Sequence, residues 1–334
     1  MITTRTINLK NRPTGKPEMA DFDFTTVELP SIQEGELLLA TKYVSVDPYL
    51  RGRMRDTPSY APPFELNKPI VSVVVAEVLE SKSSNFSKGD FVTGMLPWQE
   101  KLIASAKGVS KVDPKKAPLS AYLGILGMTG LTAYLGLTEI GKPKKGETLV
   151  VSGAAGAVGS IVGQIAKILG LRVVGTAGSD EKVELIKSKF AFDAGINYKT
   201  TDNMTKAIAD FCPDGVDVYF DNVGGEISDA VLPNINKFSR TVNCGAISVY
   251  NNIEVPKSLS VQPFLVKTSS LMQGFIIVDF EDKFPQAIQQ LAKWMQEGKL
   301  RYSETVRHGF ENIPQAFLDL FEGKNQGKMV VNLD

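Results

Sequence analysis

The spacing of apolar residues along the chain changes near residue 126. Before that point, short β-type segments alternate with Pro- and Gly-rich turns, as in residues 35–46, 70–79 and 90–95. This pattern is typical of an irregular, barrel-like β domain. Beyond it, short apolar runs of strand length alternate with stretches in which apolar residues recur at helical spacing. The pattern therefore predicts two domains that are built differently.

The second region predicts an α/β fold. Its strand candidates are residues 148–152, 171–175, 194–198, 216–220, 240–244 and 271–277, and an amphipathic helix is predicted over 283–297. Six strands that alternate with helices form a doubly wound parallel sheet. The tail holds a further amphipathic helix, 314–321, and a β-rich end, 328–332, which we expect to return to the first domain. The predicted domains are residues 126–300, and residues 1–125 together with 301–334.

The most informative segment is the turn after the first of these strands. It reads Ser-Gly-Ala-Ala-Gly-Ala-Val-Gly-Ser over residues 152–160, between a buried strand and a helix that Gly170 ends. In a dinucleotide-binding domain such a turn brings backbone N–H groups and a helix N-terminus to a pyrophosphate. Gly156 allows close approach of the backbone, and Gly159 allows the helix to pack on the strand. Ala154 stands where the first glycine of the fingerprint is expected, so a simple strand-to-helix turn is the alternative.

The end of the second strand indicates which nucleotide is bound. An NAD site places a carboxylate there for the ribose 2′-hydroxyl. Residues 176–179 contain none, and Asp180 and Glu181 follow at a helix start, where acids are common. Lys182 is available for a 2′-phosphate, although a solvated lysine is equally compatible with the sequence. The absent acid and the available base favour NADP(H).

Composition excludes several classes of function. The 37 basic and 37 acidic residues cancel, which gives no indication of nucleic acid or an anionic membrane as a partner. The N-terminus carries no signal-peptide pattern and no apolar run is long enough to span a bilayer, so we expect a cytoplasmic protein. The two cysteines, Cys212 and Cys244, fit a reducing compartment and, with the single histidine His308, are too few for a zinc site. We expect His308 to be a surface or loop residue rather than a general acid.

One loop is a candidate substrate wall. Residues 58–69 are rich in proline and include Tyr60 and Phe64. These side chains could line an apolar substrate, although a plain surface loop is the favoured interpretation.

Several motifs together resemble those of a known family. They are Val-Asp-Pro-Tyr-Leu-Arg-Gly-Arg-Met at 46–54, Leu-Gly-Met-Thr-Gly-Leu-Thr-Ala-Tyr at 126–134, the glycine turn at 152–160, Ala-Gly-Ser-Asp-Glu-Lys at 177–182, Phe-Asp-Asn-Val-Gly-Gly at 220–225, Cys-Gly-Ala-Ile-Ser at 244–248 and Gly-Phe-Glu-Asn-Ile-Pro at 309–314. Nearly end to end, the chain resembles the zinc-independent medium-chain dehydrogenases/reductases, and within them the NADPH-dependent alkenal/one oxidoreductases. The resemblance implies a GroES-like catalytic domain beside the dinucleotide-binding domain, and a homodimer.

The resemblance also implies where NADPH is bound. The pyrophosphate would lie on residues Gly156, Ala157, Val158 and Gly159, and the 2′-phosphate on Lys182 and Tyr198. The remaining implied contacts surround the ribose and nicotinamide, and they are Asn222, Cys244, Gly245, Ala246, Ile247, Ser248, Tyr250, Phe275, Ile276, Ile277 and Asn325. Most of these stretches follow predicted strands, where an open α/β sheet binds its ligands.

The implied reaction is hydride transfer to the β-carbon of an α,β-unsaturated ketone or aldehyde, which reduces the C=C bond. Negative charge then develops on the carbonyl oxygen, and hydrogen-bond donors must stabilise it. Tyr49 and Tyr250 are the candidate donors, with Tyr250 slightly favoured, and a buried tyrosine bonded to the backbone is the alternative for each. Other readings of the whole chain are a quinone reductase of the same superfamily and a non-catalytic NADPH-binding sensor.

The chain departs from the family pattern at two positions. Lys267 stands where some members have a tyrosine near the active site, and Thr129 stands where proline is common. The substrate preference of a relative therefore cannot be transferred directly to this chain.

Overall fold

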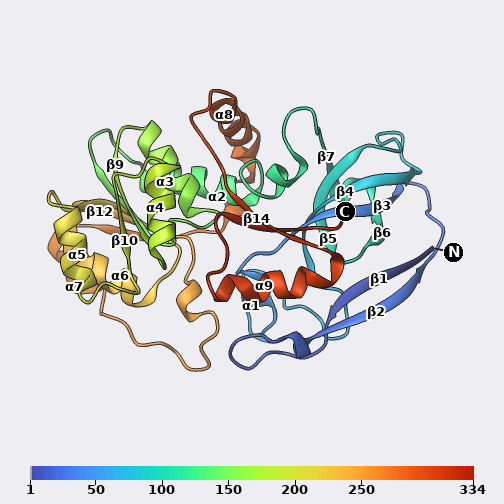
Figure 1. Ribbon diagram of the computed structural model, residues 1–334, viewed down its shortest axis with the longest axis horizontal. Helices are drawn as coiled ribbons and strands as arrows, with labels where there is room; N and C mark the ends of the chain where they lie inside the picture. The colour runs from blue at the N-terminus through green and yellow to red at the C-terminus, as the bar shows by residue number, and fades with distance from the viewer. Residues whose placement is uncertain (1) are drawn as a thin grey trace. The chain divides into compact units, whose positions relative to one another are not determined.

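A computed structural model describes residues 2–334, which form two compact units (Figure 1). Unit 1 contains the residues up to Gly124, together with Thr305–Asn325 and Met329–Asp334. Unit 2 contains Ile125–Glu304 and Gln326–Lys328. Each unit has its own sheet and its own apolar core.

Unit 2 is built on a six-stranded parallel sheet with the order β10-β9-β8-β11-β12-β13. The strands are β8 (Thr148–Val151), β9 (Arg172–Ala177), β10 (Ala194–Asn197), β11 (Val216–Asp221), β12 (Ile235–Asn243) and β13 (Leu271–Gly274). The chain starts at the centre, runs to one edge and then continues from the centre to the other edge. The order therefore reverses between β8 and β11, which is where such sheets bind ligands. The predicted doubly wound α/β fold is confirmed.

The last predicted strand, 271–277, is three residues too long. β13 ends at Gly274, which pairs with Asn243, the final residue of β12. Beyond that register the neighbouring strand offers no further ladder, and the chain leaves the sheet at Phe275.

Helices cover both faces of this sheet. The helices of unit 2 are α2 (Met128–Leu135), α3 (Gly159–Ile168), α4 (Asp180–Ser188), α5 (Met204–Phe211), α6 (Gly225–Val231), α7 (Gln262–Thr268) and α8 (Phe284–Gln296). On one face, Val150 and Val174 pack in a buried cluster with Ile208 of α5 and with residues of α6. On the opposite face, a Cβ at the next residue, Gly175, would lie 2.7 Å from Ile186 of α4, so α4 covers that face.

Unit 1 contains a seven-stranded sheet and a separate hairpin. The sheet order is β14-β15-β3-β4-β5-β7, and β6 pairs with β3. The strands are β3 (Glu36–Ser45), β4 (Val71–Ser81), β5 (Phe91–Pro97), β6 (Lys101–Ser105), β7 (Val109–Val112), β14 (Glu304–His308) and β15 (Lys328–Asn332), and the hairpin is β1 (Ile2–Leu9) with β2 (Phe22–Leu29). The predicted segments 35–46, 70–79 and 90–95 correspond to β3, β4 and β5.

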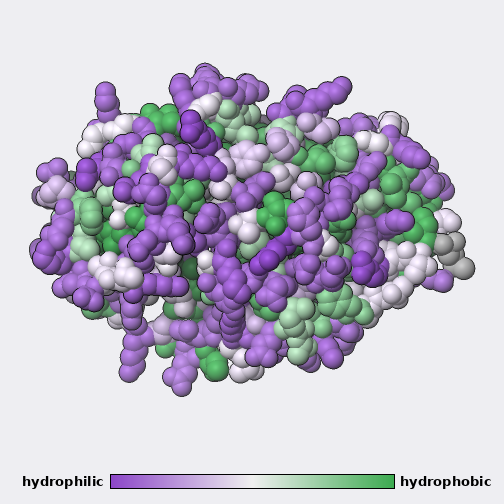
Figure 2. All heavy atoms as spheres, viewed as in Figure 1, coloured by the Kyte–Doolittle hydropathy of each residue, from purple (hydrophilic) through white to green (hydrophobic). Residues whose placement is uncertain are grey.

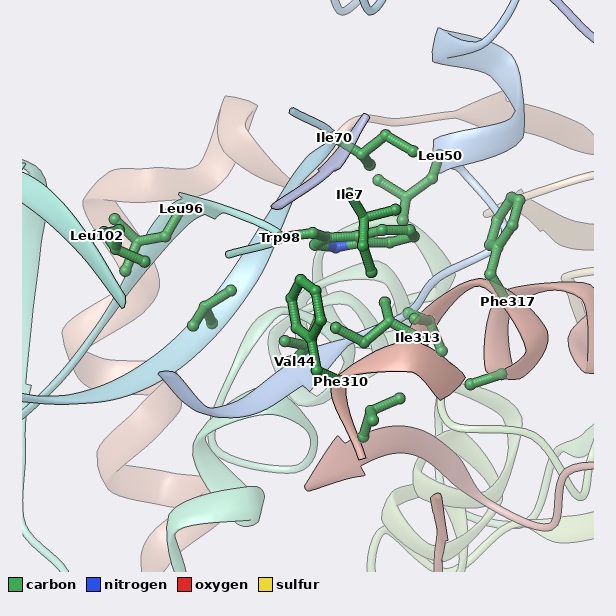
Figure 3. Close-up of a cluster of buried hydrophobic side chains, with 14 of the residues drawn as sticks. Ile7, Val44, Leu50, Ile70, Leu96, Trp98, Leu102, Phe310, Ile313 and Phe317 are labelled. Atoms are coloured by element: carbon green, nitrogen blue, oxygen red, sulfur yellow. The ribbon is translucent and has the colours of Figure 1, made fainter. Parts of the chain in front are cut away.

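The core of unit 1 surrounds Trp98, which is fully buried beside Ile7 and Leu50 (Figure 3). The indole N–H of Trp98 donates a 2.8 Å hydrogen bond to Ser72 Oγ. Helix α9 (Ile313–Phe321), from the C-terminal tail, adds Phe317 to the same cluster. A core that joins residues so distant in sequence explains why residues 305–325 belong to unit 1.

Three residues of the tail, Gln326–Lys328, belong to unit 2 instead. The N–H of Gly327 donates to the carbonyl of Ala155 (2.7 Å), and the N–H of Lys328 donates to that of Ser303 (2.9 Å). These bonds fasten the tail beside the glycine turn, a detail that the sequence pattern did not predict.

The face shown in Figure 2 is largely hydrophilic, with apolar areas between the hydrophilic side chains. No helix among residues 2–334 is long and apolar enough to cross a membrane.

Candidate active site

The glycine turn lies between β8 and α3 at the carboxyl edge of the unit 2 sheet. Gly153, with φ +61°, makes the tight turn that the sequence analysis looked for one residue later, at Ala154. A Cβ at Gly159 would lie 2.4 Å from the carbonyl oxygen of Gly153, and one at Gly156 would lie 3.1 Å from it. Backbone atoms therefore exclude a side chain at Gly159 and leave only a tight fit for one at Gly156.

The start of α3 is suited to an anion. No side chain caps this ten-residue helix, which Gly159 opens. The first N–H groups of a helix have no intrahelical partners, and the helix dipole favours negative charge there. The turn therefore fits a pyrophosphate, and Gly156, Ala157, Val158 and Gly159 stay the predicted residues that would hold it.

A second cluster lies at the ends of β9 and β10. Lys182 is half-buried, and burial, together with the nearby Lys199 ammonium, lowers its pKa. A Cβ at Gly178 would lie 2.7 Å from the Tyr198 hydroxyl and 3.4 Å from Lys199 Cε, so these side chains line a site next to the Gly178 backbone. A multiply charged anion placed between two ammonium groups would offset their repulsion, so this cluster is a candidate anion site.

Lys199 is a further candidate residue that the sequence analysis missed. It directly follows Tyr198 at the end of β10, and this adjacency was the available signal. Asp180, at the start of α4, accepts a 2.8 Å hydrogen bond from the side-chain amide of Asn197. This bond joins the Asp180 carboxylate to the end of β10.

The loops that follow β11 and β12 are bonded to each other. The N–H of Ser248 donates to the carbonyl of Val223 (3.1 Å), and the Ser248 hydroxyl donates to the same oxygen (2.6 Å). The side-chain amide of Asn222 donates to the carbonyl of Ser152 (2.8 Å), which joins both loops to the glycine turn. The structure thus brings together Asn222, the loop 244–250 and the predicted pyrophosphate site.

Tyr250 folds back onto its own loop. Its hydroxyl accepts a hydrogen bond from the N–H of Ala246 (3.2 Å), and a Cβ at Gly245 would lie 2.9 Å from that hydroxyl. Burial raises the pKa of Tyr250, so the phenol keeps its proton at neutral pH. The structure places Tyr250 at the predicted edge and gives its oxygen a backbone bond.

Cys244 begins the same loop. Burial and the nearby Asp221 raise the pKa of the Cys244 thiol to about 12. The thiol is therefore protonated and unreactive at neutral pH. Any contribution of Cys244 to a cofactor would come from its main chain or its shape.

Phe275 lies where the chain leaves β13, and its ring turns inward. A Cβ at Gly136 would lie 2.7 Å from Phe275 Cζ and 3.0 Å from the ring of Phe220. The Phe275 ring also makes an edge contact with Phe280, at 6.3 Å between centroids. A packed ring leaves the main chain of residues 275–277 as the part that could bind a cofactor, with Ile276 and Ile277 partly buried.

Tyr49 belongs to unit 1, in the turn between β3 and the short helix α1 (Leu50–Arg53). The N–H of Leu50 donates to the carbonyl of Asp47 (3.2 Å), which closes a turn with Pro48 at its second position. The Asp47 carboxylate accepts from the Ser45 hydroxyl and fixes the turn.

The hydroxyl of Tyr49 is shielded from solvent and has no hydrogen-bond partner among the described residues. Burial and the charge of Asp47 raise the pKa of Tyr49 well above its usual range. The group is thus a protonated donor at any physiological pH. A buried hydroxyl without a partner is unusual and needs an explanation, such as a ligand that accepts from it.

The candidate loop 58–69 is not a free apolar wall. Phe64 is buried in the core of unit 1, and the Arg53 guanidinium lies 4.1 Å from its ring centroid. Arg53 also donates a hydrogen bond to the carbonyl of Pro62 (3.0 Å). Tyr60 is 61% exposed. The suggestion that both rings line a substrate is wrong for Phe64, whose ring is needed inside the core.

The remaining candidates are dispersed. Asn325 is the last unit 1 residue before the segment fastened at Ala155. His308 is exposed at the end of β14, Lys267 is exposed on α7, and Thr129 is buried in α2. Within residues 2–334, no three or more His, Cys, Asp or Glu side chains group as metal ligands.

Comparisons with known proteins identify oxidoreductase domains in both parts of the chain. A model described as the N-terminal domain of oxidoreductase matches residues 5–112, and one described as zinc-binding dehydrogenase matches residues 157–293. The chain is 56% identical to "Putative NADP-dependent oxidoreductase YfmJ" of Bacillus subtilis, covering 98% of this chain and 97% of the relative.

The chain belongs to the zinc-independent medium-chain dehydrogenase/reductase family.

Two further relatives add names with a function. A 2-alkenal reductase (NADP(+)-dependent) of Nicotiana tabacum is 43% identical, covering 99% of this chain and 97% of the relative. The crystal structure of CurA in complex with NADPH from Vibrio vulnificus superposes with a TM-score of 0.94 at 39% identity, covering 99% of both chains. The resemblance stated from the sequence motifs is confirmed.

Proposed function

We propose that this chain is an NADPH-dependent reductase of the C=C bond of α,β-unsaturated ketones and aldehydes. The observation that carries the proposal is its 43% identity, over 99% of the chain, to a protein named as an NADP-dependent 2-alkenal reductase, together with a fold that superposes on an NADPH complex. Three local features support it: the glycine turn, the neighbouring Lys182 and Lys199, and the Tyr49 hydroxyl without a hydrogen-bond partner.

The cofactor assignment divides the edge of unit 2 into three parts. Gly156, Ala157, Val158 and Gly159 hold the pyrophosphate, and Lys182, Tyr198 and Lys199 hold the 2′-phosphate. The ribose and nicotinamide are surrounded by the loops after β11, β12 and β13, and Asn325 stays a contact implied by the family resemblance. Unit 2 is then the NADPH-binding domain, and unit 1 is the catalytic and substrate domain.

When bound, NADPH supplies the hydride that reduces the β-carbon. The protein's own task is to stabilise the charge that develops on the carbonyl oxygen, which becomes an enolate. Tyr49 is the donor we assign to that oxygen, because its hydroxyl is protonated and has no other partner. Its raised pKa means that Tyr49 donates a hydrogen bond and keeps its proton, so the proton that completes the α-carbon comes from another source, such as water.

Tyr250 takes a second role in this proposal. Its oxygen accepts from the Ala246 N–H, and this bond shapes the loop 244–250. Tyr250 thus supports the loop that we assign to the cofactor. The order of the two tyrosines is therefore the reverse of the sequence-based preference.

A small panel of substrates tests the proposal. We expect a medium-chain alkenal and an aryl enone to consume NADPH and to yield products that keep the carbonyl group. A saturated aldehyde, the matched control, has the carbonyl without the C=C bond and should consume none. Turnover of a quinone alone would favour a quinone reductase, and tight NADPH binding with no turnover would favour a sensor.

The proposed homodimer forms at the β13 edge of the sheet. β13 is the last strand of the sheet order, and edge strands present unpaired backbone groups. Exposed apolar side chains lie on or near it, among them Leu271 at 68% and Val278 at 60%. A second copy would continue the sheet and cover them. Leu271→Lys should then give monomers in analytical ultracentrifugation, and an unchanged dimer would place the interface elsewhere.

A cytoplasmic location completes the proposal. Cys212 and Cys244 are both free thiols, which supports a reducing compartment.

A further inference from the structure

A buried carboxylate lies at the centre of the carboxyl edge of the unit 2 sheet. Asp221 is the last residue of β11, next to the point where the strand order reverses, and its side chain is 4% exposed. Its Oδ1 atom accepts three hydrogen bonds, from Ser152 Oγ (2.8 Å) and from the N–H groups of Val223 (3.0 Å) and Gly224 (2.9 Å). A carboxylate is costly to bury and is retained where such donors stabilise its charge.

The main chain of Asp221 binds a further loop. Its carbonyl accepts from the N–H groups of Cys244 (2.8 Å) and Gly245 (3.1 Å), at the start of the loop 244–250. The same residue therefore holds the loop after β11 through its carboxylate and the loop after β12 through its carbonyl.

Ser152 extends this network to the glycine turn. Its hydroxyl donates to Asp221 Oδ1 and accepts from the N–H of Asn222 (2.8 Å). The Ser152 carbonyl also accepts from the Asn222 side-chain amide (2.8 Å). Ser152 is fully buried, so solvent does not replace these bonds when one is lost.

We propose that Asp221 is a positioning residue for the nicotinamide half of NADPH, acting through the loops 222–225 and 244–250. This inference rests on the proposed function, which assigns both loops to the ribose and nicotinamide. The 2′-phosphate cluster of Lys182 and Lys199 lies at the ends of β9 and β10, and none of the bonds of Asp221 reaches it. The two halves of the binding site should therefore respond differently to a change at Asp221.

The test compares two ligands by equilibrium titration. NADPH occupies the whole site, whereas adenosine 2′,5′-bisphosphate carries only the adenosine half. Asp221→Asn keeps the shape of the side chain and removes its charge, which weakens all three bonds to Oδ1. We expect the Kd for NADPH to rise by about tenfold or more, and the Kd for the bisphosphate to stay within about twofold.

Asp217→Asn is the matched control. Asp217 is on the same strand, and its carboxylate also joins β11 to both neighbours, accepting from the Thr148 N–H (2.8 Å) and the Asn236 amide (2.9 Å). It lies near the amino end of β11, away from the ligand edge. This variant should lower the melting temperature and leave the ratio of the two Kd values unchanged.

Ser152→Ala is a second variant, for use where Asp221→Asn lowers the yield of folded protein. It keeps the Asp221 charge and removes the hydroxyl between Asp221 and Asn222, so the same selective weakening of NADPH is expected, to a smaller extent. Equal weakening of both ligands by these variants, or no weakening of NADPH, would overturn the inference alone. A wild-type chain that binds the bisphosphate and not NADPH would overturn the proposed function, and this inference with it.

Discussion

The Tyr49 hydroxyl offers a prediction in which stability and activity change in opposite directions. Tyr49→Phe removes one oxygen atom that is shielded from solvent and has no hydrogen-bond partner. A buried polar group left without a partner costs about 1–3 kcal/mol. The variant should therefore be as stable as the wild type or more stable, by up to about 1 kcal/mol, because phenylalanine fills the same site without that cost.

Activity should fall in the same variant. Loss of one donor to a developing oxyanion costs about 2.7–4 kcal/mol of transition-state stabilisation, a decrease of roughly 10²–10³-fold in kcat. Steady-state kinetics on an aryl enone and a thermal melt of the same preparation measure both effects. The KM for NADPH should not change, since the assigned contact is with the substrate.

Tyr250→Phe is the comparison that makes the result decisive. Its hydroxyl accepts from the Ala246 N–H, so its removal leaves a partly buried backbone donor without an acceptor. This variant should be destabilised by about 1–3 kcal/mol. The reasoning would be refuted if Tyr49→Phe melted at a lower temperature than the wild type and kept full turnover, because the hydroxyl would then serve the fold.

Three more predictions concern the cofactor site. Lys182→Ala, and to a lesser degree Lys199→Ala, should raise the KM for NADPH by a factor that corresponds to about 1.5–3 kcal/mol, and should leave the KM for NADH unchanged. Equal effects on both KM values would exclude a role at the 2′-phosphate. Burial and the Lys199 ammonium lower the pKa of Lys182, so Lys182 loses its proton at a lower pH than an ordinary lysine. The preference for NADPH over NADH should therefore decline as pH rises, and Lys199→Ala should move that decline to higher pH. A ratio of the two KM values that stayed constant up to the usual lysine range would contradict this. Gly159→Ala should lower the melting temperature and weaken NADPH binding, because its Cβ would lie 2.4 Å from a backbone oxygen and overpacking costs about 1–3 kcal/mol; a stable variant with normal binding would show that the turn can relax.

The parallel sheet could be predicted because its strands are buried on both faces and therefore appear as short apolar runs. The strands missed in unit 1 lack that signal. β2 has three consecutive exposed residues, Thr26 to Glu28, and β14 is half-exposed along its length. Their positions depend on pairing with partners distant in sequence, which local patterns do not reveal.

The site was only partly predictable for a related reason. The turn could be recognised, but the glycine with positive φ is Gly153, and only the backbone geometry distinguishes it from its neighbours. The roles that we propose for Asp221 and Lys199 depend on neighbours that the fold supplies, namely Ser152 and Lys182. An acid at a strand end or a lysine after a tyrosine has no distinctive sequence pattern until those neighbours are in place.

The most direct test of the proposed reaction follows the hydride itself. NADPH that carries deuterium at the transferred position of its nicotinamide is incubated with the enzyme and an aryl enone, and the product is analysed by NMR. The proposal predicts a saturated ketone with deuterium on the β-carbon. Deuterium on the carbonyl carbon of an allylic alcohol, or oxidation of NADPH with no deuterium in the product, would contradict it.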